Sequence, residues 1–282
     1  MRLFAITTAT LICFSANSLL TRGALGTDRI DWASFTLIRL VTGALMLALL
    51  VRLRNRTATE RGSWTSAAAL TGYAVAFTYA YTRIGAAIGA LLLFGAVQAT
   101  MIGTGLMRGE RPARTDWLGV ALALGGLLVL TLPGATAPDG LGAALMILAG
   151  VSWGIYSLAG RGSRDSLAAT SGNFWRGAVL TALAVGWFIE ASRMTTAGVL
   201  LASASGAIAS GVGYTLWYTA LPSLAAWRAA IVQLVVPVLT ALLAAFLLAE
   251  RIESRLIVAT VLVSAGVLVT SGRPRGAHKI TA

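Results

Sequence analysis

The sequence predicts an all-α integral membrane protein, with ten transmembrane helices arranged as two inverted five-helix repeats and both termini on the cytoplasmic side. Three observations lead to this prediction. The chain is 57% hydrophobic and only 11% charged, with a mean hydropathy of +0.81, whereas a soluble domain carries about 25% charged residues. Apolar segments of membrane-spanning length follow one another along the 282 residues. Short motifs of the first half also recur in the second half at a nearly constant distance.

The apolar segments account for nearly the whole chain. A helix needs about 20 apolar residues to cross a bilayer, so ten of them with short connections leave no room for a soluble domain. Lipid offers no hydrogen-bond partner to an open backbone, which favours helices over isolated strands. The predicted spans cover residues 3–21, 31–51, 64–82, 86–107, 116–132, 140–159, 167–189, 196–220, 224–249 and 255–271.

The recurring motifs indicate a duplication. Arg22-Gly23 recurs as Arg161-Gly162, 139 residues later, and Glu110-Arg111 recurs as Glu250-Arg251, 140 residues later. Each copy holds five predicted spans, and an odd number of spans turns the second copy upside down. We therefore expect a first repeat at residues 1–135 and an inverted second repeat at residues 136–282.

The distribution of positive charge predicts the orientation. With the N-terminus inside, the inner loops and termini hold fourteen Lys and Arg residues and the outer loops hold six. Because positive charge collects on the cytoplasmic side, both termini are expected there. Arg22 then lies outside and Arg161 inside, as an inverted duplication requires. Inverted repeats around a midplane site are typical of secondary transporters.

Charge and cysteine content exclude several other classes. The net charge is +12, but the arginines lie in small groups between apolar segments, as in cytoplasmic loops. We therefore expect no nucleic-acid partner. Cys13, the single cysteine, lies within the first predicted span, so there is no disulfide framework.

The chain also lacks the usual signatures of an enzyme. It has no His-Glu-x-x-His motif, no acidic metal-binding cluster and no Ser/His pair. We expect no catalytic residues, no metal and no cofactor. The expected partners are a small-molecule substrate and the lipid bilayer, with no obligate protein partner.

Polar and aromatic residues inside the spans are the candidates for a binding site, because burying them in hydrocarbon needs a reason. Trp153, Tyr156 and Ser157 share one helix face through their i, i+3 and i+4 spacing. In the third span, Tyr73, Phe77 and Tyr81 form one stripe with Tyr79 to the side. The predicted substrate-binding residues are Asn17, Tyr79, Tyr81, Gln98, Trp153, Tyr156, Trp175, Tyr214, Trp217 and Gln233. The alternatives are that the rings form interfacial belts and that the amides join helices.

A second set of residues is expected to have structural or gating roles: Arg39, Arg176, Pro237, Glu110 and Glu250. Arg39 and Arg176 lie near the middles of the second and seventh spans. Each could bind a substrate carboxylate through its planar fork. Alternatively, each binds helix-end carbonyls or extends along a water-filled vestibule.

The acidic residues lie away from the membrane centre. All ten carboxylates fall in predicted loops or at span ends, and the only histidine is His278 in the tail. Proton-driven pumps typically carry such a group within the membrane. Transport is therefore expected to be facilitative, or coupled through a group that is not an obvious buried acid.

The chain resembles the EamA-type branch of the drug/metabolite transporter superfamily. The matching segments are Phe35–Leu40, Phe174–Arg176, Tyr218–Leu221, Pro237, Gly109–Arg111 and Ala249–Arg251. The resemblance implies a ten-helix fold in a bacterial inner membrane, with a central cavity and export of metabolites. Within this family, the chain resembles bacterial exporters of aromatic amino acids and methionine. The alternatives are an exporter of organic cations, held by cation–π contacts, and a lipid-modifying membrane enzyme.

Overall fold

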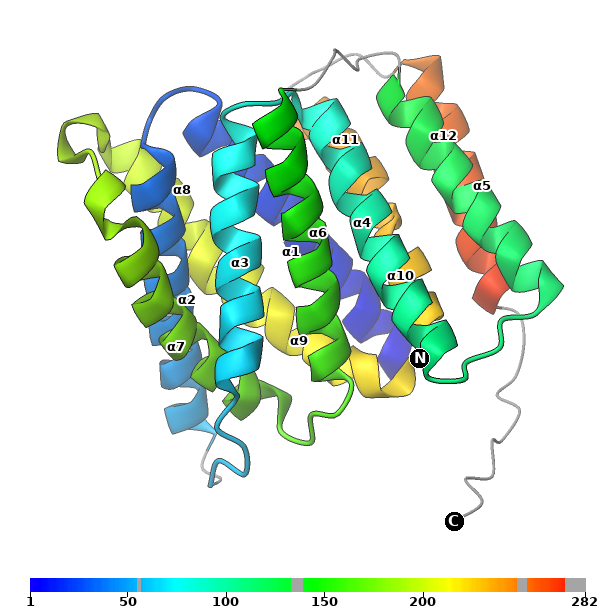
Figure 1. Cartoon of the computed structure of the whole chain (residues 1–282), viewed down its shortest axis with the longest axis horizontal. Coiled ribbons are helices and arrows are strands. Elements are labelled where there is room, and N and C mark those ends of the chain that lie inside the picture. Colours follow the sequence, from blue (N-terminus) through cyan, green and yellow to red (C-terminus); the bar gives the residue numbers. More distant parts are fainter. Residues whose placement is uncertain (55–56, 133–138, 248–252, 272–282) are drawn as a thin grey trace.

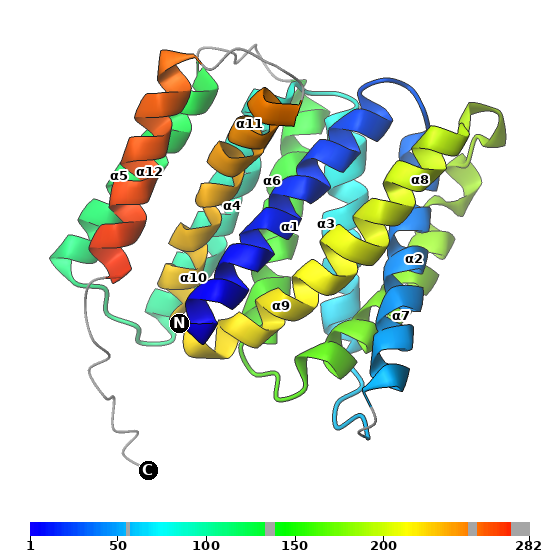
Figure 2. The same cartoon turned by 180° about the vertical axis from the view of Figure 1, so that it is seen from behind.

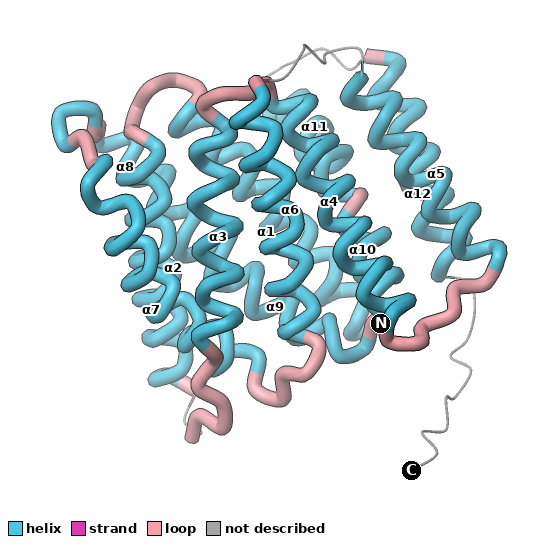
Figure 3. The backbone as a smooth tube through the Cα atoms, viewed as in Figure 1, coloured by secondary structure: helices cyan, strands magenta, loops and turns pink. Residues whose placement is uncertain are grey.

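Helices joined by short loops make up the described part of the protein. The computed structural model describes residues 1–54, 57–132, 139–247 and 253–271, and no strand occurs in these ranges (Figures 1 and 3). The long elements run in alternating directions between two ends of a bundle (Figure 2). We call the end where α1 begins the N-terminal end, and the other the opposite end; α12 finishes at the N-terminal end.

The elements are α1 (Arg2–Leu25), α2 (Trp32–Leu53), α3 (Trp64–Tyr81), α4 (Ala86–Met107), α5 (Arg114–Thr131), α6 (Gly140–Gly160), α7 (Ser166–Val185), η2 (Gly186–Phe188), η3 (Ala191–Arg193), α8 (Thr196–Ala204), η4 (Ser205–Val212), α9 (Gly213–Ala220), η5 (Leu221–Ser223), α10 (Ala226–Gln233), α11 (Val235–Leu247) and α12 (Ser254–Ser271). Here η4 is a π-helical segment, and the other η elements are 3₁₀ turns.

Many of these elements are apolar enough to cross a membrane. Within the described ranges, seven helical segments meet that criterion by length and composition: α1, α2, α4, α5, α6, the segment from α8 to η5, and α10 with α11. The elements α3, α7 and α12 lie beside them but are not in this group. The all-helical membrane class is thus confirmed, whereas the count of ten spans and the orientation stay predictions.

Loop carboxylates begin several helices. Asp31 accepts a hydrogen bond from the Ser34 amide at the start of α2, at 2.8 Å. Asp139 and Asp165 act in the same way at the starts of α6 and α7. A side-chain acceptor at this position satisfies an amide that has no partner within the helix. This capping role explains why these three carboxylates lie at the ends of the spans.

Helix packing is similar in the two halves of the chain. The helices α3 and α4 pack on α6, and α9 and α11 pack on α1. The helices α2 and α7 pack on each other, as do α5 and α12. Here α6 is the counterpart of α1, and α9 and α11 are the counterparts of α3 and α4. Each contact between one pair of helices therefore has an equivalent contact between their counterparts. The α5–α12 pair lies at one side of the bundle (Figure 1).

A proline separates α10 from α11. Proline has no amide hydrogen to donate to the residue four positions earlier. Pro237 thus leaves the Gln233 carbonyl without its helical partner, and the helix is interrupted at Leu234. The equivalent α4, which has Val97 in place of proline, runs without interruption. The two equivalent segments therefore differ in the continuity of their helices.

Gly206 permits the close approach of η4 to α2. A Cβ atom at this position would collide with the Arg39 carbonyl and with Thr42. We expect Gly206→Ala to destabilise the protein by about 2 kcal/mol or more, because the backbone cannot move aside. Gly95→Ala is the matched control, since a Cβ there meets nothing within 4 Å; it should be neutral or stabilise by about 1 kcal/mol. Chemical unfolding in detergent measures both, and equal stability of the two variants would contradict the prediction.

Candidate functional site

A large cavity reaches the surface at the opposite end of the bundle. It has a volume of about 480 Å³ and is lined by residues of α1, α3, α4, α5, α6, α11 and α12. Arg22, Ala86 and Glu253 at its rim are exposed. Deeper, its walls are mostly apolar and include Phe77 and Tyr81. Sites for small molecules have volumes of roughly 300–1,000 Å³, so this main cavity is large enough for a metabolite.

A small cavity lies next to the main cavity. It has a volume of about 50 Å³. The residues that line both cavities are Ser18, Phe77, Leu93, Phe94 and Val236. The remaining walls of the small cavity are Phe14, Asn17, Tyr73, Val97, Trp153, Tyr214 and Gln233. The two cavities together provide a wide apolar space that narrows among aromatic and amide side chains.

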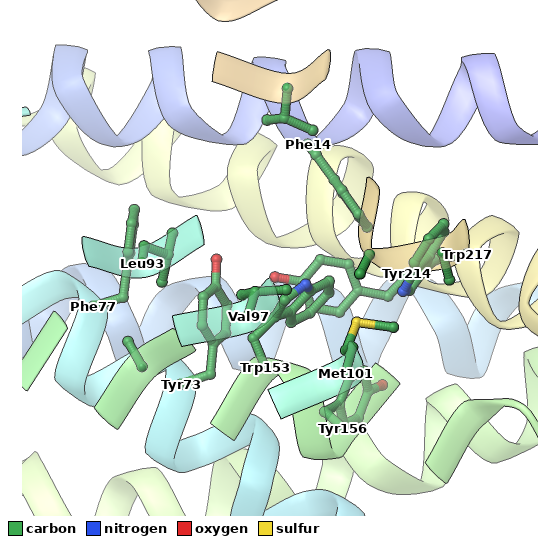
Figure 4. Packing of buried hydrophobic residues seen from close by; sticks show 14 of the residues in the cluster. Phe14, Tyr73, Phe77, Leu93, Val97, Met101, Trp153, Tyr156, Tyr214 and Trp217 are labelled. Carbon is green, nitrogen blue, oxygen red and sulfur yellow. The ribbon is translucent and has the colours of Figure 1, made fainter. Parts of the chain in front are cut away.

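Trp153 is at the centre of the aromatic walls of the small cavity. Its ring centroid lies 4.7 Å from that of Tyr214, 5.0 Å from Tyr73 and 5.3 Å from Phe14. Figure 4 shows these rings converging from different helices. Aromatic pairs at these separations stabilise one another beyond simple burial. The walls of the small cavity are therefore held in place by contacts between the rings themselves.

Gln233 fixes the orientation of the Trp153 ring. The Trp153 Nε1–H donates to Gln233 Oε1, while Gln233 Nε2 donates to the Ala229 carbonyl at 3.1 Å. Gln233 is fully buried. Because both of its polar ends are occupied, the amide cannot rotate without losing a hydrogen bond.

Most of the predicted residues are buried in this region. Those that line a cavity are Asn17, Tyr81, Trp153, Tyr214, Gln233 and Pro237. Tyr156 and Trp217 lie behind the walls: Tyr156 is 5.7 Å from the Trp153 ring, and Trp217 donates to the Ser157 hydroxyl at 3.0 Å. Both side chains are fully buried.

Two other predicted residues, Tyr79 and Trp175, lie away from both cavities and from their walls. Tyr79 lies against Trp32, with ring centroids 4.8 Å apart. Trp175 is 63% exposed on the surface of α7. Helical geometry explains why Tyr79 does not line a cavity, because its side chain leaves the helix on a different side from the stripe formed by Tyr73, Phe77 and Tyr81. Trp175 therefore faces the surface of the bundle, whereas Tyr79 packs against the start of α2.

The amides also join helices. The Ser205 hydroxyl donates to Asn17 Oδ1 at 2.7 Å, which links η4 to α1. Gln98 Nε2 donates to the Ala230 carbonyl at 2.8 Å, which links α4 to α10. Asn17 therefore both lines a cavity and joins helices, whereas Gln98 joins helices only.

The two central arginines have different environments. Arg39 is completely buried, and its Nη2 donates to the Tyr214 hydroxyl at 2.6 Å. Arg176 is partly exposed and donates to the carbonyls of Arg61 and Gly172. Arg176 thus binds one backbone carbonyl in the loop before α3 and one within its own helix, α7.

Several wall residues were absent from the predicted set. Tyr73 and Phe77 belong to the aromatic stripe of α3, so their spacing already carried a signal. Phe14 lies one helical turn before Asn17, which places both on one face of α1. Leu93 and Phe94 look like any apolar residues of a membrane helix, and no sequence signal distinguishes them.

Known proteins match both the sequence and the fold. A model of the EamA-like transporter family matches residues 140–272. An uncharacterised protein of Pseudomonas aeruginosa is 52% identical over 267 residues, which cover 94% of this chain and 93% of that protein. The chain belongs to the EamA-like transporter family. One solved crystal structure shares the transporter's fold, with a TM-score of 0.81 at 19% identity, covering 96% of this chain and 97% of that one.

Family membership makes the chain a multi-pass membrane transporter and confirms the resemblance seen in the sequence. Across the described ranges, no group of three or more His, Cys, Asp or Glu residues could hold a metal ion.

Contacts between the two halves of the transporter occur at its N-terminal end. Glu110, at the end of α4, forms an ion pair of 2.8 Å with Arg161 at the end of α6. Both Glu110 carboxylate oxygens also accept from the Ala226 amide at the start of α10, at 3.0 and 3.1 Å. Glu250, the repeat counterpart of Glu110, lies outside the described residues.

A second set of contacts joins the loop before α3 to the start of α7. Arg54 donates two hydrogen bonds to the Asp165 carboxylate, which also accepts from Thr59. Glu60 accepts from the Ser163 hydroxyl and from the Arg164 amide. Together with the Glu110 contacts, these bonds join the two halves at the N-terminal end, while the main cavity reaches the surface at the opposite end.

The Asp165 contacts should make this closure sensitive to acid. The hydrogen bonds from Arg54, followed by those from the Thr59 and Ala168 amides, hold the pKa of Asp165 well below its ordinary value of about 3.9. Because the pKa is lower in the folded protein, the bonds stabilise it fully above that ordinary value. Their contribution falls as the pH drops toward the folded-state pKa. We expect Asp165→Asn to unfold more readily than the native protein at pH 7, and the difference to shrink toward pH 3.

Thermal unfolding in detergent at a series of pH values measures this effect. Glu190→Asn is a suitable control, because Glu190 is an exposed acid at the opposite end that pairs only with its neighbour Arg193 among the described residues. A difference between native protein and Asp165→Asn that stays constant from pH 7 to pH 3 would rule out the Asp165 mechanism.

Proposed function

We propose that the transporter exports small hydrophobic metabolites, with aromatic amino acids and methionine as substrates. The substrate binds in the joined cavities and is released by alternating access. In this proposal the two repeats, residues 1–135 and 136–282, lie in opposite orientations in the inner membrane of a bacterium. Both termini face the cytoplasm, so the main cavity faces outward.

The aromatic walls of the small cavity are the observation that carries this proposal. Phe14, Tyr73, Trp153 and Tyr214 surround a space that continues into the apolar main cavity. A phenyl, indole or thioether group in the main cavity can pack on Phe77 and Phe94, which line both cavities where this space begins. The size of the main cavity supports a substrate of amino-acid dimensions.

The state of the two ends supports alternating access. An exporter of this kind needs one conformation that is closed inside and open outside. The contacts of Glu110 and Asp165 close the N-terminal end, while the main cavity reaches the opposite surface. Equivalent helices of the two halves make equivalent contacts. This similarity supports a rearrangement in which the two halves exchange conformations, so that the N-terminal end opens and the opposite end closes.

Transport in this proposal is facilitative. Among the described residues, the buried carboxylates are Asp31 and Asp116, and both lie in the first turn of a helix or just before it. Neither is placed to carry a proton through the membrane centre.

Flux from proteoliposomes tests the proposal. Vesicles containing the purified protein are loaded with labelled phenylalanine, methionine or tetraethylammonium, and release is followed over time. Release of unchanged phenylalanine and methionine, with mutual competition, is the expected result. Release of tetraethylammonium alone would favour the organic-cation alternative, and chemical change without flux would favour an enzyme.

A matched pair of variants connects the flux to the cavity. Phe77 lines both cavities, whereas Phe246 on α11 is 85% exposed. Phe77→Ala should reduce phenylalanine release, and Phe246→Ala should leave it unchanged. Equal flux in the two variants would remove the cavity from the transport route.

A further inference from the structure

Arg39 is a buried cation without an acidic partner. Its side chain is fully buried, and it forms no ion pair within the described ranges. Its partners are neutral: Nε donates to the Ser210 hydroxyl at 2.8 Å, and Nη2 donates to the Tyr214 hydroxyl at 2.6 Å. Nη1 has no hydrogen-bond partner. A buried charge is destabilising unless it is compensated, so the absence of an anion here calls for a functional explanation.

The other buried charges have structural explanations. Asp31 caps α2, and Asp116 accepts from the Ala113 amide at 2.7 Å in the first turn of α5. Arg176, which is only partly buried, is bound by backbone carbonyls. Arg39 differs from all three because its partners are hydroxyl groups, one of which belongs to Tyr214 in the wall of the small cavity.

The surroundings of Arg39 depend on the π-helical segment η4. Gly206 lets η4 approach the backbone of α2, and Ser210 then reaches the guanidinium of Arg39. Ser205, five residues earlier, bonds instead to Asn17 in the wall of the small cavity. π-Helical segments are rare and occur mostly at functional sites. Here η4 connects the arginine and the cavity wall.

Tyr214 connects the arginine to the small cavity. A guanidinium only donates hydrogen bonds, so the Tyr214 oxygen accepts from Arg39 and its own proton remains for another acceptor. Tyr214 lines the small cavity, as does Tyr73, whose ring centroid is 5.4 Å from the Arg39 guanidinium carbon. Figure 4 shows the Tyr214 and Tyr73 side chains close to the Trp153 ring. The small cavity is thus bordered by a hydroxyl donor that a buried positive charge polarises.

We propose that Arg39, acting through the Tyr214 hydroxyl, makes the small cavity the binding site for the carboxylate group of the substrate. The cavity has room for such a group, because about 10–15 Å³ of this volume is enough for one water molecule and about 50 Å³ is present. The apolar part of the substrate then extends into the main cavity. Arg39 is a positioning residue, and its positive charge disfavours amines that lack a carboxylate.

This inference rests on the proposed function for the class of substrate. It selects apolar carboxylates from the molecules that the aromatic walls accept. It also predicts that an organic cation of the same shape binds poorly, although cation–π contacts alone would favour it.

Three probes of similar shape test the inference: L-phenylalanine, 3-phenylpropionate and 2-phenylethylamine. Their affinities for the purified protein in detergent are measured by calorimetric titration. We expect both carboxylates to bind about tenfold or more tightly than the amine, because charge-assisted hydrogen bonds are the stronger kind. Arg39→Gln should bring this ratio close to one, and Arg39→Lys should restore part of it.

Two further variants separate recognition from folding. Tyr214→Phe keeps the ring and Arg39 but removes the hydroxyl, so it should also lower the carboxylate preference. Arg176→Gln changes the arginine at the equivalent position of the other half, which binds backbone carbonyls, and should keep the preference. A purely structural role for Arg39 would change stability in Arg39→Gln but leave the ratio of affinities unchanged.

The outcomes distinguish the inference from the proposed function. Carboxylate preference without flux in proteoliposomes would support the inference and reject the export function. Flux of phenylalanine, with the amine bound equally well, would overturn the inference and keep the function. Failure of all three probes to bind would overturn both.

Discussion

Replacing Trp153 with alanine should lower phenylalanine flux about tenfold or more, because aromatic contacts of this kind are each worth about 0.5–1.5 kcal/mol and several are lost together. The variant removes the ring that contacts Tyr73, Tyr214 and Phe14 in the wall of the small cavity. It also leaves the Gln233 oxygen without the indole hydrogen that it accepts. Flux per correctly folded molecule in proteoliposomes measures the effect.

Other tryptophans provide the controls. Trp175→Ala should retain full flux, because Trp175 is exposed on α7 and lines neither cavity. Trp217→Ala should lower the free energy of unfolding by about 3–5 kcal/mol, as for other buried aromatic residues, with a smaller effect on substrate affinity. If Trp153→Ala and Trp175→Ala gave the same flux, Trp153 would have no place in the substrate site.

Replacing Glu110 with alanine should open the N-terminal end of the bundle. The variant loses the ion pair with Arg161 and the acceptor of the Ala226 amide at the start of α10. A helix cap of this kind is worth about 1 kcal/mol, and the partly exposed ion pair adds up to about 1 kcal/mol. The closed form should therefore become less populated by roughly tenfold or more.

Cysteine labelling measures this opening. A Leu224→Cys reporter, placed beside the Arg161 contact, is introduced into a Cys13→Ser background, and an impermeant maleimide is added to inside-out vesicles. Glu110→Ala should speed the labelling, Glu110→Gln should speed it less, and Glu190→Gln should not change it. An unchanged rate in Glu110→Ala would show that this contact does not hold the end closed.

Much of the candidate site could be predicted from local spacing. Trp153, which shares a helix face with Tyr156, and the stripe of Tyr73, Phe77 and Tyr81 both lead to the cavity walls. The prediction failed to separate Tyr79 from that stripe as a binding residue, and it included Trp175, which is exposed. In a membrane helix most sides are apolar, so the pattern does not say which side faces lipid and which faces another helix.

The sequence by itself determined the membrane class, the succession of apolar helices, the recurring motifs and the family resemblance, because these are properties of composition and order along the chain. Only the tertiary structure decided which aromatic rings meet and where the cavity opens. It also distinguished Arg39 from Arg176, two arginines at similar depths that the sequence could not separate. The physical reason is that a buried charge is defined by its partners, and the hydroxyls of Ser210 and Tyr214 are more than 170 residues away from Arg39.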